Sequence, residues 1–170
     1  MSVVVRRAMP ADALGIASVH VLAWVETYSH LVPADALARQ SVTQRERRWT
    51  EIIAAGEIAV WVAVDEERIV GFASSGPTRG DSPPTDLELE AIYVVASHHG
   101  SGAGQSLIDS ALGGRAASVW VAEDNPRARR FYERNGFEAD GATAMHTLAG
   151  TPVPAIRMER ADRARSRVGR

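Results

Sequence analysis

The chain has no cysteine in its 170 residues, and it has no lysine, because all 19 basic residues are arginine. Without thiols it has no disulfide, thiolate zinc site or cysteine acyl-enzyme. Without lysine it has no Walker-type phosphate loop, which requires that residue. The formal net charge is only −2, which gives no electrostatic reason to expect nucleic acid as a partner.

Long apolar runs are also missing. No run reaches the roughly 18 apolar residues of a membrane-spanning helix, so we expect no membrane partner. The first residues lack the apolar stretch of a signal peptide, and with the absence of cysteine this predicts a cytoplasmic location. The length, and an apolar content of 45%, suit one globular domain with a core of its own.

Periodicity and turn residues divide the chain into alternating strands and helices. Period-two or continuous apolar segments predict strands at 2–7, 58–64, 69–75, 87–95, 117–122, 137–145 and 153–160. Helical spacing predicts helices at about 12–28, 34–39, 43–55, 105–112 and 126–134. The basic segment 161–170 has no apolar period, and we expect it to be a disordered tail rather than a binding element.

The stretch from residue 87 to 112 places three alternate glycines between a strand and a helix. Gly100, Gly102 and Gly104 permit positive φ and a close ligand approach, and the helix behind them presents free N–H groups. Such a turn is suited to a phosphate group, although a glycine-rich connector without a ligand remains the simpler alternative. A Rossmann fingerprint is excluded because Gln105 and Leu107 stand where its third glycine is required.

A second pattern, N-x-x-A-x-x-F-Y-x-x-x-G-F, runs over residues 125–137 and follows one strand later. Asn125 suits a helix N-cap, and Pro126 suits the first helical position. The two patterns, in this order, resemble motifs A and B of the GCN5-related N-acetyltransferase (GNAT) superfamily. The specific resemblance covers residues 87–137, and the order of elements extends it to roughly 2–160.

This resemblance implies a mixed α/β fold. Its central sheet would be mixed, mostly antiparallel and twisted, with six to seven strands flanked by about four helices and a splay between the fourth and fifth strands. It implies a single domain over residues 1–160 that transfers acetyl from acetyl-CoA, without a metal, to a primary amine of a small molecule or peptide. Direct attack is expected because no cysteine is present, and a homodimer is a possible state.

The resemblance also assigns residues to the co-substrate. A pantetheine arm would pair with the strand at residues 92–94, and phosphates would lie on the glycine loop. His99 stands where the family commonly has glutamine or arginine, so main-chain N–H groups would carry more of the binding, with Arg127, Arg129 or Arg130 as cations. The assigned set is Ile92, Tyr93, Val94, His99, Gly100, Ser101, Gly102, Ala103, Gly104, Gln105, Asn125 and Tyr132.

Three residues are predicted to take part in the chemistry. By resemblance, Tyr132 would protonate the leaving sulfur; otherwise it is a core tyrosine on an apolar helix face. Glu88 and Glu90, two residues apart on one strand face, are candidate bases, or else they face solvent or pair with arginine. Further candidates for the base are Glu26, His30 and His146.

The segment around residues 24–30 is predicted to line the acceptor side. It gathers Trp24, Glu26, Tyr28 and His30 near a helix end, although core packing would equally explain the two aromatic residues. Two other functions stay open: a CoA-binding module without catalysis, and transfer of a larger acyl group. No metal is expected, since His98 and His99 lack a suitably spaced partner.

Overall fold

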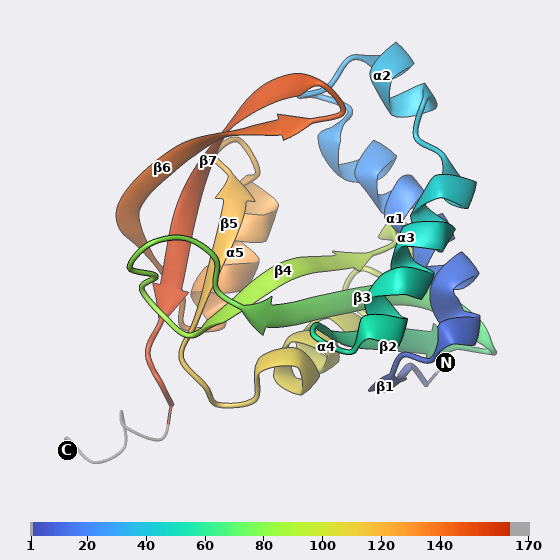
Figure 1. Cartoon of the computed structure of the whole chain (residues 1–170), viewed down its shortest axis with the longest axis horizontal. Coiled ribbons are helices and arrows are strands. Elements are labelled where there is room, and N and C mark those ends of the chain that lie inside the picture. The colour runs from blue at the N-terminus through green and yellow to red at the C-terminus, as the bar shows by residue number, and fades with distance from the viewer. Residues whose placement is uncertain (1, 164–170) are drawn as a thin grey trace.

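Seven strands form one twisted sheet in the computed structural model, which describes residues 2–163 (Figure 1). The strands are β1 (Val4–Arg7), β2 (Ala59–Asp65), β3 (Arg68–Pro77), β4 (Leu87–Val94), β5 (Ala117–Ala122), β6 (Glu138–Leu148) and β7 (Thr151–Arg160). The α-helices of the described part are α1 (Ala13–Tyr28), α2 (Ala34–Ala38), α3 (Val42–Ala55), α4 (Ala103–Leu112) and α5 (Pro126–Arg134). Short 3₁₀ turns, η1 (Pro10–Asp12) and η2 (Ala96–His98), precede α1 and the glycine loop.

The strand order is β1-β2-β3-β4-β5-β7-β6, and every neighbouring pair except β4 and β5 is antiparallel. The parallel pair is joined at only two positions, Glu88 with Ser118 and Leu89 with Val119. Beyond these positions the two strands diverge, which opens the sheet at its centre. The predicted fold class, with its mostly antiparallel sheet and its splay between the fourth and fifth strands, is confirmed.

Helices cover both faces of the sheet, as two adjacent residues of β3 demonstrate. Phe72 packs against the rings of His20 on α1 and Trp49 on α3. A Cβ atom on Gly71 would lie 3.2 Å from Leu107 on α4. Successive residues of a strand point to opposite faces, so α1 and α3 cover one face and α4 covers the other.

Helix α4 is held by its apolar stripe. Its inward side chains are at most 1% exposed: Leu107, Ile108, Ala111 and Leu112. Burial of each large one stabilises the fold by about 1.5–3 kcal/mol. This packing fixes the helix N-terminus, and with it the glycine loop, against the end of β4.

A second, smaller hydrophobic cluster lies apart from the main core. Val32, Ala36 and Leu37, around α2, form it with Leu148 and Ala149 at the tip of the β6–β7 hairpin. In Figure 1 this hairpin arches over to the α1–α2 side of the molecule. The cluster therefore joins two segments that are more than a hundred residues apart along the chain.

One local feature interrupts the pairing of β3 with β4, and a second lies at the C-terminal end, where a disordered tail was expected from residue 161. The register between β3 and β4 shifts between Ser74 and Ser75, so Glu90 has no cross-strand partner and forms a β-bulge. At the C-terminal end, the Arg163 N–H donates to Gly114 O at 2.8 Å, so the chain is still anchored there. The rest of the predicted tail, residues 164–170, lies outside the described residues.

Candidate functional site

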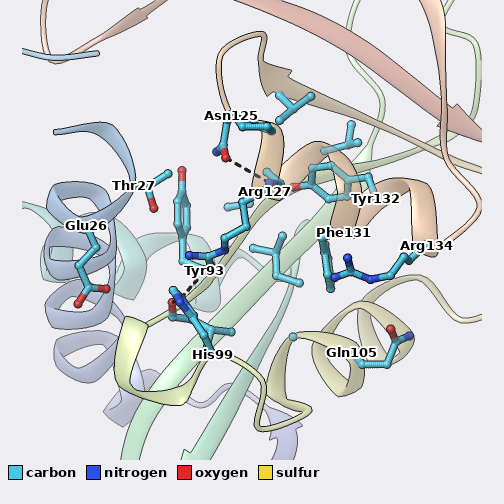
Figure 2. Close-up of a pocket in the computed structure, with 18 of the residues that line it drawn as sticks. Glu26, Thr27, Tyr93, His99, Gln105, Asn125, Arg127, Phe131, Tyr132 and Arg134 are labelled. Carbon is cyan, nitrogen blue, oxygen red and sulfur yellow. Dashed lines mark hydrogen bonds between the residues drawn. The ribbon is translucent and has the colours of Figure 1, made fainter. Parts of the chain in front are cut away.

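A cleft of about 720 Å³ opens where β4 and β5 diverge. Its walls are the second half of β4, the glycine loop, the middle of β5, helix α5 and the C-terminal end of α1, as Figure 2 shows. The predicted site residues that line it are Glu26, Tyr28, His30, Glu90, Ile92, Tyr93, Val94, His99, Gly100, Gly102, Gly104, Gln105, Asn125 and Tyr132. Four of the assigned residues are not in its lining, namely Trp24, Glu88, Ser101 and Ala103, and neither is the further base candidate His146.

The glycine loop ends in backbone geometry that few other residues adopt. Gly100 and Gly102 have φ of 79° and 89°, and a Cβ atom on either would meet nothing within 4 Å. Glycine is therefore required by conformation at these two positions and not by crowding. Gly102 is the N-cap of α4, and the first intrahelical bond runs from Ser106 N–H to Gly102 O.

That first bond leaves the N–H groups of Gly104 and Gln105 without an intrahelical partner. They point out of the positive end of the helix at the wall of the cleft, which is a site for an anion. Gly104 has a different role from the other two glycines. A Cβ atom there would lie 3.4 Å from Phe131 of α5, so glycine lets the two helices approach closely.

His99 and Arg127 meet across the mouth of the cleft. The His99 Nε2 atom lies 2.9 Å from Val94 O, the last carbonyl of β4, and 2.8 Å from Nη2 of Arg127. Figure 2 shows Arg127 reaching from α5 to His99, beside the glycine loop. Arg127 is thus the one of the three candidate arginines that lines the cleft.

The side chains of two further predicted cofactor residues have structural partners. The Gln105 amide donates to Asn135 Oδ1 at 2.9 Å and to Asp109, so it joins α4 to the end of α5. Asn125 accepts from Ala128 N–H at 3.2 Å and caps α5. These residues can therefore offer a ligand main-chain groups more readily than free side chains.

All three tyrosines of the chain converge on this cleft: Tyr28, Tyr93 and Tyr132. The hydroxyl oxygens of Tyr28 and Tyr93 are 3.0 Å apart and share a hydrogen bond. Tyr132 is 7% exposed, and Figure 2 shows its hydroxyl directed into the cleft on the side of Tyr93. Burial raises the pKa of each phenol above its ordinary value, so all three are neutral at neutral pH.

The predicted carboxylates are spread over different surroundings. Glu90 lines the cleft, but its Oε1 lies 3.1 Å from Nη2 of Arg79. Glu88 is half-buried outside the cleft lining, where burial raises its carboxyl pKa. Glu26 accepts the N–H of Ala96 at 2.8 Å and so holds α1 to the start of the glycine loop.

The remaining acceptor-side predictions are also placed by the structure. The ring of Trp24 packs against the ring of Tyr28. The guanidinium carbon of Arg45 lies over the Trp24 ring, 4.7 Å from the ring centre. His30 lines the cleft, and its Nε2 lies 2.8 Å from Asp124 O, beyond the end of β5. Trp24 thus supports the wall of the cleft from behind, whereas His30 closes one end of it.

Sequence reasoning did not identify several residues of the lining, of which Trp120 is the largest. It stands on β5 between Val119 and Val121. The centre of its ring lies 5.2 Å from the ring centre of His146 and 5.7 Å from the guanidinium carbon of Arg157. The alternation of β5 places Trp120 on the face opposite to those two buried valines. That pattern could have suggested an aromatic group beside the splay, whereas Thr27 carried no such signal.

Two absences hold for the part of the chain that the structure describes. Residues 2–163 contain no group of three or more metal-binding side chains. In the same range, no helix combines the length and apolar character that crossing a membrane requires.

Comparison with known families and curated proteins gives consistent matches. The family model described as acetyltransferase (GNAT) domain matches residues 56–139. The chain is 37% identical over 131 residues to YuaI of Bacillus subtilis (strain 168), an uncharacterized N-acetyltransferase; this covers 73% of the chain and 74% of the relative. It is 26% identical over 158 residues to Rv2775 of Mycobacterium tuberculosis, a probable N-acetyltransferase, covering 89% and 90% of the two chains.

Solved structures share the fold at low sequence identity. PaiA N-acetyltransferase from Thermoplasma acidophilum, in complex with coenzyme A, superposes with a TM-score of 0.70 at 16% identity, over 95% of this chain and 99% of that one. A GCN5-related N-acetyltransferase from Rhodopseudomonas palustris gives a TM-score of 0.71 at 20% identity, over 95% and 96%. These likenesses extend over nearly the whole sheet and its helices.

Proposed function

Since the chain belongs to the GNAT acetyltransferases, we propose that it transfers the acetyl group of acetyl-CoA to a primary amine by direct attack. The amine belongs to a small molecule or to a peptide. One observation carries this proposal: a single cleft joins an anion site, an open strand edge and a buried phenol. These are the three features that a phosphate-bearing thioester requires.

The residues present fit such a thioester. The N–H groups of Gly104 and Gln105 would hold its phosphates, and Arg127 would add a positive charge from the facing helix. The diverging edge of β4, over residues 92–94, offers main-chain groups to an extended amide-containing arm. When bound, the co-substrate supplies an acetyl group activated as a thioester.

Protein groups near the splay would assist the transfer. Main-chain N–H groups of β4 that β5 does not pair can polarise the acetyl carbonyl. Tyr132 stays protonated because burial raises its pKa, so it can donate a proton to the leaving sulfur. The apolar lining from Ile92, Val119 and Phe131 reduces competition from water.

The test has two parts, a binding measurement and a screen for thiol release. The melting temperature should rise with acetyl-CoA and with free CoA, because a ligand at a hundred times its Kd stabilises the folded state by about 2.7 kcal/mol. A panel of primary amines is then screened for CoA release with a thiol reagent. The protein itself contributes no background, since it contains no cysteine.

Arg127→Gln provides the matched variant, with Arg79→Gln as its control outside the phosphate end. We expect the first to weaken CoA binding several-fold and the second to leave it unchanged. Binding without thiol release from any amine would instead favour a non-catalytic CoA-binding module. Release only from longer acyl thioesters would favour a different acyltransferase.

A further inference from the structure

The Tyr28 and Tyr93 hydroxyls form a pair inside the cleft that the proposed transfer leaves without a role. The two residues come from α1 and β4, and their oxygens are 3.0 Å apart. Both side chains line the cleft that also contains Tyr132. The pair is therefore available to a molecule that enters beside the thioester.

Packing holds this pair in one geometry. The ring of Tyr93 packs against the rings of His20 and Phe72, with ring centres 5.4 and 5.7 Å apart. The ring of Tyr28 stands edge-on to Trp24 at 5.3 Å. Because these aromatic neighbours restrict both rings, the hydroxyl pair is preorganised for a substrate.

The carboxylates around the cleft have other partners. Within the described residues its lining contains two of them, Glu26 and Glu90, which are bonded to Ala96 N–H and to Arg79. The imidazoles of the lining are also engaged. His98 bonds Asp65, and His30 bonds Asp124 O. His99 Nε2 lies within hydrogen-bond distance of both Val94 O and Arg127 Nη2, and its tautomer decides which of the two it bonds.

We infer that the Tyr28–Tyr93 hydroxyl pair receives the proton that the attacking amine loses, and that the acceptor is a weakly basic primary amine. This inference rests on the proposed acetyl transfer. A neutral hydroxyl cannot deprotonate an ammonium group in the way a carboxylate or imidazole can. The acceptor must therefore arrive as the free amine.

The proton transfers balance without any additional reactant. The amine nitrogen forms a bond to the acetyl carbon while the carbon–sulfur bond breaks, and the sulfur takes the proton of Tyr132. The nitrogen's proton passes to Tyr28 while the proton of Tyr28 moves to Tyr93. Tyr93 releases its own proton to water in the cleft, and the Tyr132 oxygen takes up a proton from water. The products are an amide and a free thiol, and all three phenols are restored.

The basicity of common biological amines makes this inference selective. A peptide α-amino group has a pKa of about 7.7–8.0, so about a third of it is neutral at pH 7.5. A lysine side chain, with a pKa of about 10.4, is only about 0.1% neutral at that pH. A hydroxyl pair would therefore favour the α-amine by about two orders of magnitude.

Two peptides of one sequence test the acceptor class. One has a free α-amino group and an acetylated lysine, and the other has an acetylated α-amino group and a free lysine. We expect kcat/KM at pH 7.5 to be at least tenfold higher for the first. Equal values, or a preference for the lysine amine, would overturn the inference while leaving the proposed acetyl transfer intact.

Phe substitutions test the hydroxyl pair itself, because each removes one oxygen and keeps the ring. Tyr28→Phe and Tyr93→Phe should each lower kcat at least tenfold, and the double variant should lose little more, since the hydroxyls act as a unit. The solvent deuterium isotope effect on kcat should fall in both. Acetyl-CoA affinity and melting temperature should change little.

Glu90→Gln and His30→Gln serve as rival variants. If either lowers kcat more than Tyr28→Phe does, a conventional base operates and the hydroxyl pair does not. Unchanged kcat and isotope effect in Tyr28→Phe would overturn the inference as well. Absence of turnover by the wild type with every amine, despite acetyl-CoA binding, would overturn the proposed function and this inference together.

Discussion

At the scale of single residues, Tyr132 takes its chemistry from its surroundings. It is buried on α5 beside Phe131 and Phe137, and its hydroxyl faces the cleft. We predict that Tyr132→Phe lowers kcat by about a hundredfold, the lower range for loss of a general acid, with unchanged KM for acetyl-CoA. Steady-state kinetics with the best amine of the screen measures both values.

Two controls separate this role from a structural one. The melting temperature of Tyr132→Phe should match that of the wild type, because Phe keeps the buried ring. A thioester with a more acidic leaving thiol should recover part of the lost rate, since its sulfur depends less on a proton donor. Wild-type kcat in the variant would mean that Tyr132 is a packing residue.

Asp12 is a residue whose contribution to stability depends on pH. Its carboxylate accepts bonds from both Nη atoms of Arg6, at 2.7 and 2.8 Å, and from Met9 N–H. The Arg6 bonds, and then the Met9 bond, hold its pKa below the ordinary value against the opposing effect of burial. The stabilisation is therefore present above the unfolded pKa of about 3.9 and is lost as pH falls through the folded pKa.

We predict that Asp12→Asn lowers the free energy of unfolding by about 1 kcal/mol at pH 7, a modest value because Arg6 is 39% exposed and screened by water. The difference between variant and wild type should be smaller at about pH 3 than at pH 7, because the stabilisation begins to be lost below the unfolded pKa of about 3.9. Urea unfolding of both proteins at the two pH values measures it. A difference that does not vary with pH would mean that the charge of Asp12 contributes nothing.

Sequence motifs located many of these residues, but not their contacts. Tyr132 could be predicted because it stands at a fixed place in a recognisable motif. The bond between Tyr28 and Tyr93 could not, since it joins residues 65 positions apart whose approach depends on how α1 crosses the sheet. The same is true of Glu90, whose pairing with Arg79 depends on the conformation of a glycine- and proline-rich loop.

At the scale of elements, the junction of the glycine loop with α4 is the feature on which cofactor binding should depend most. Gly102 takes the left-handed conformation as the N-cap of α4. Gly56 takes the same conformation as the C-cap of α3 and does not line the cleft. Neither has a neighbour within 4 Å of a Cβ atom, so an alanine at either position would be strained only in its backbone.

We predict that Gly102→Ala and Gly56→Ala each cost about 1 kcal/mol of stability, the usual penalty for alanine in this conformation. Only Gly102→Ala should weaken CoA binding, by about tenfold, because relief of the strain turns the N–H groups of α4 away from the phosphates. Chemical denaturation and calorimetric titration measure the two effects. Equal CoA affinity in both variants would exclude the loop as the phosphate site.

Element boundaries were predictable where local signals are strong. Asn125 and Pro126 start α5, and Gly56 ends α3, as capping preferences predict. The bulge at Glu90 was not predictable, because an alternating strand gives no local sign that its partner slips by one residue. Its register is decided by the packing of β3 and β4 between two helical layers.

At the scale of the whole molecule, the order of strands and helices followed from periodicity together with the two motifs. What periodicity did not show is that the apolar residues separate into two clusters. The main core unites the sheet with α1, α3 and α4, whereas the small cluster joins α2 and the tip of the β6–β7 hairpin to the C-terminal end of α1. Local stability should therefore differ between these two parts.

We predict that Leu148→Ala destabilises the small cluster by about 1–2 kcal/mol, since Leu148 is only half-buried there. Amide hydrogen exchange around α2 and the hairpin tip should accelerate about tenfold, as 1.4 kcal/mol corresponds to a factor of ten. Exchange in β2, β3 and β4 should stay unchanged, because these strands belong to the other cluster.

Met158→Ala is the matched control, because Met158 is 2% exposed in the main core and its truncation should cost about 2–5 kcal/mol. That variant should accelerate exchange of the slowest amides throughout the sheet, since they exchange by global unfolding. If Leu148→Ala instead accelerated exchange everywhere to the same degree, the two clusters would unfold as one. The hairpin and α2 would then be part of the frame that positions the cleft, and could not open separately to admit an acceptor.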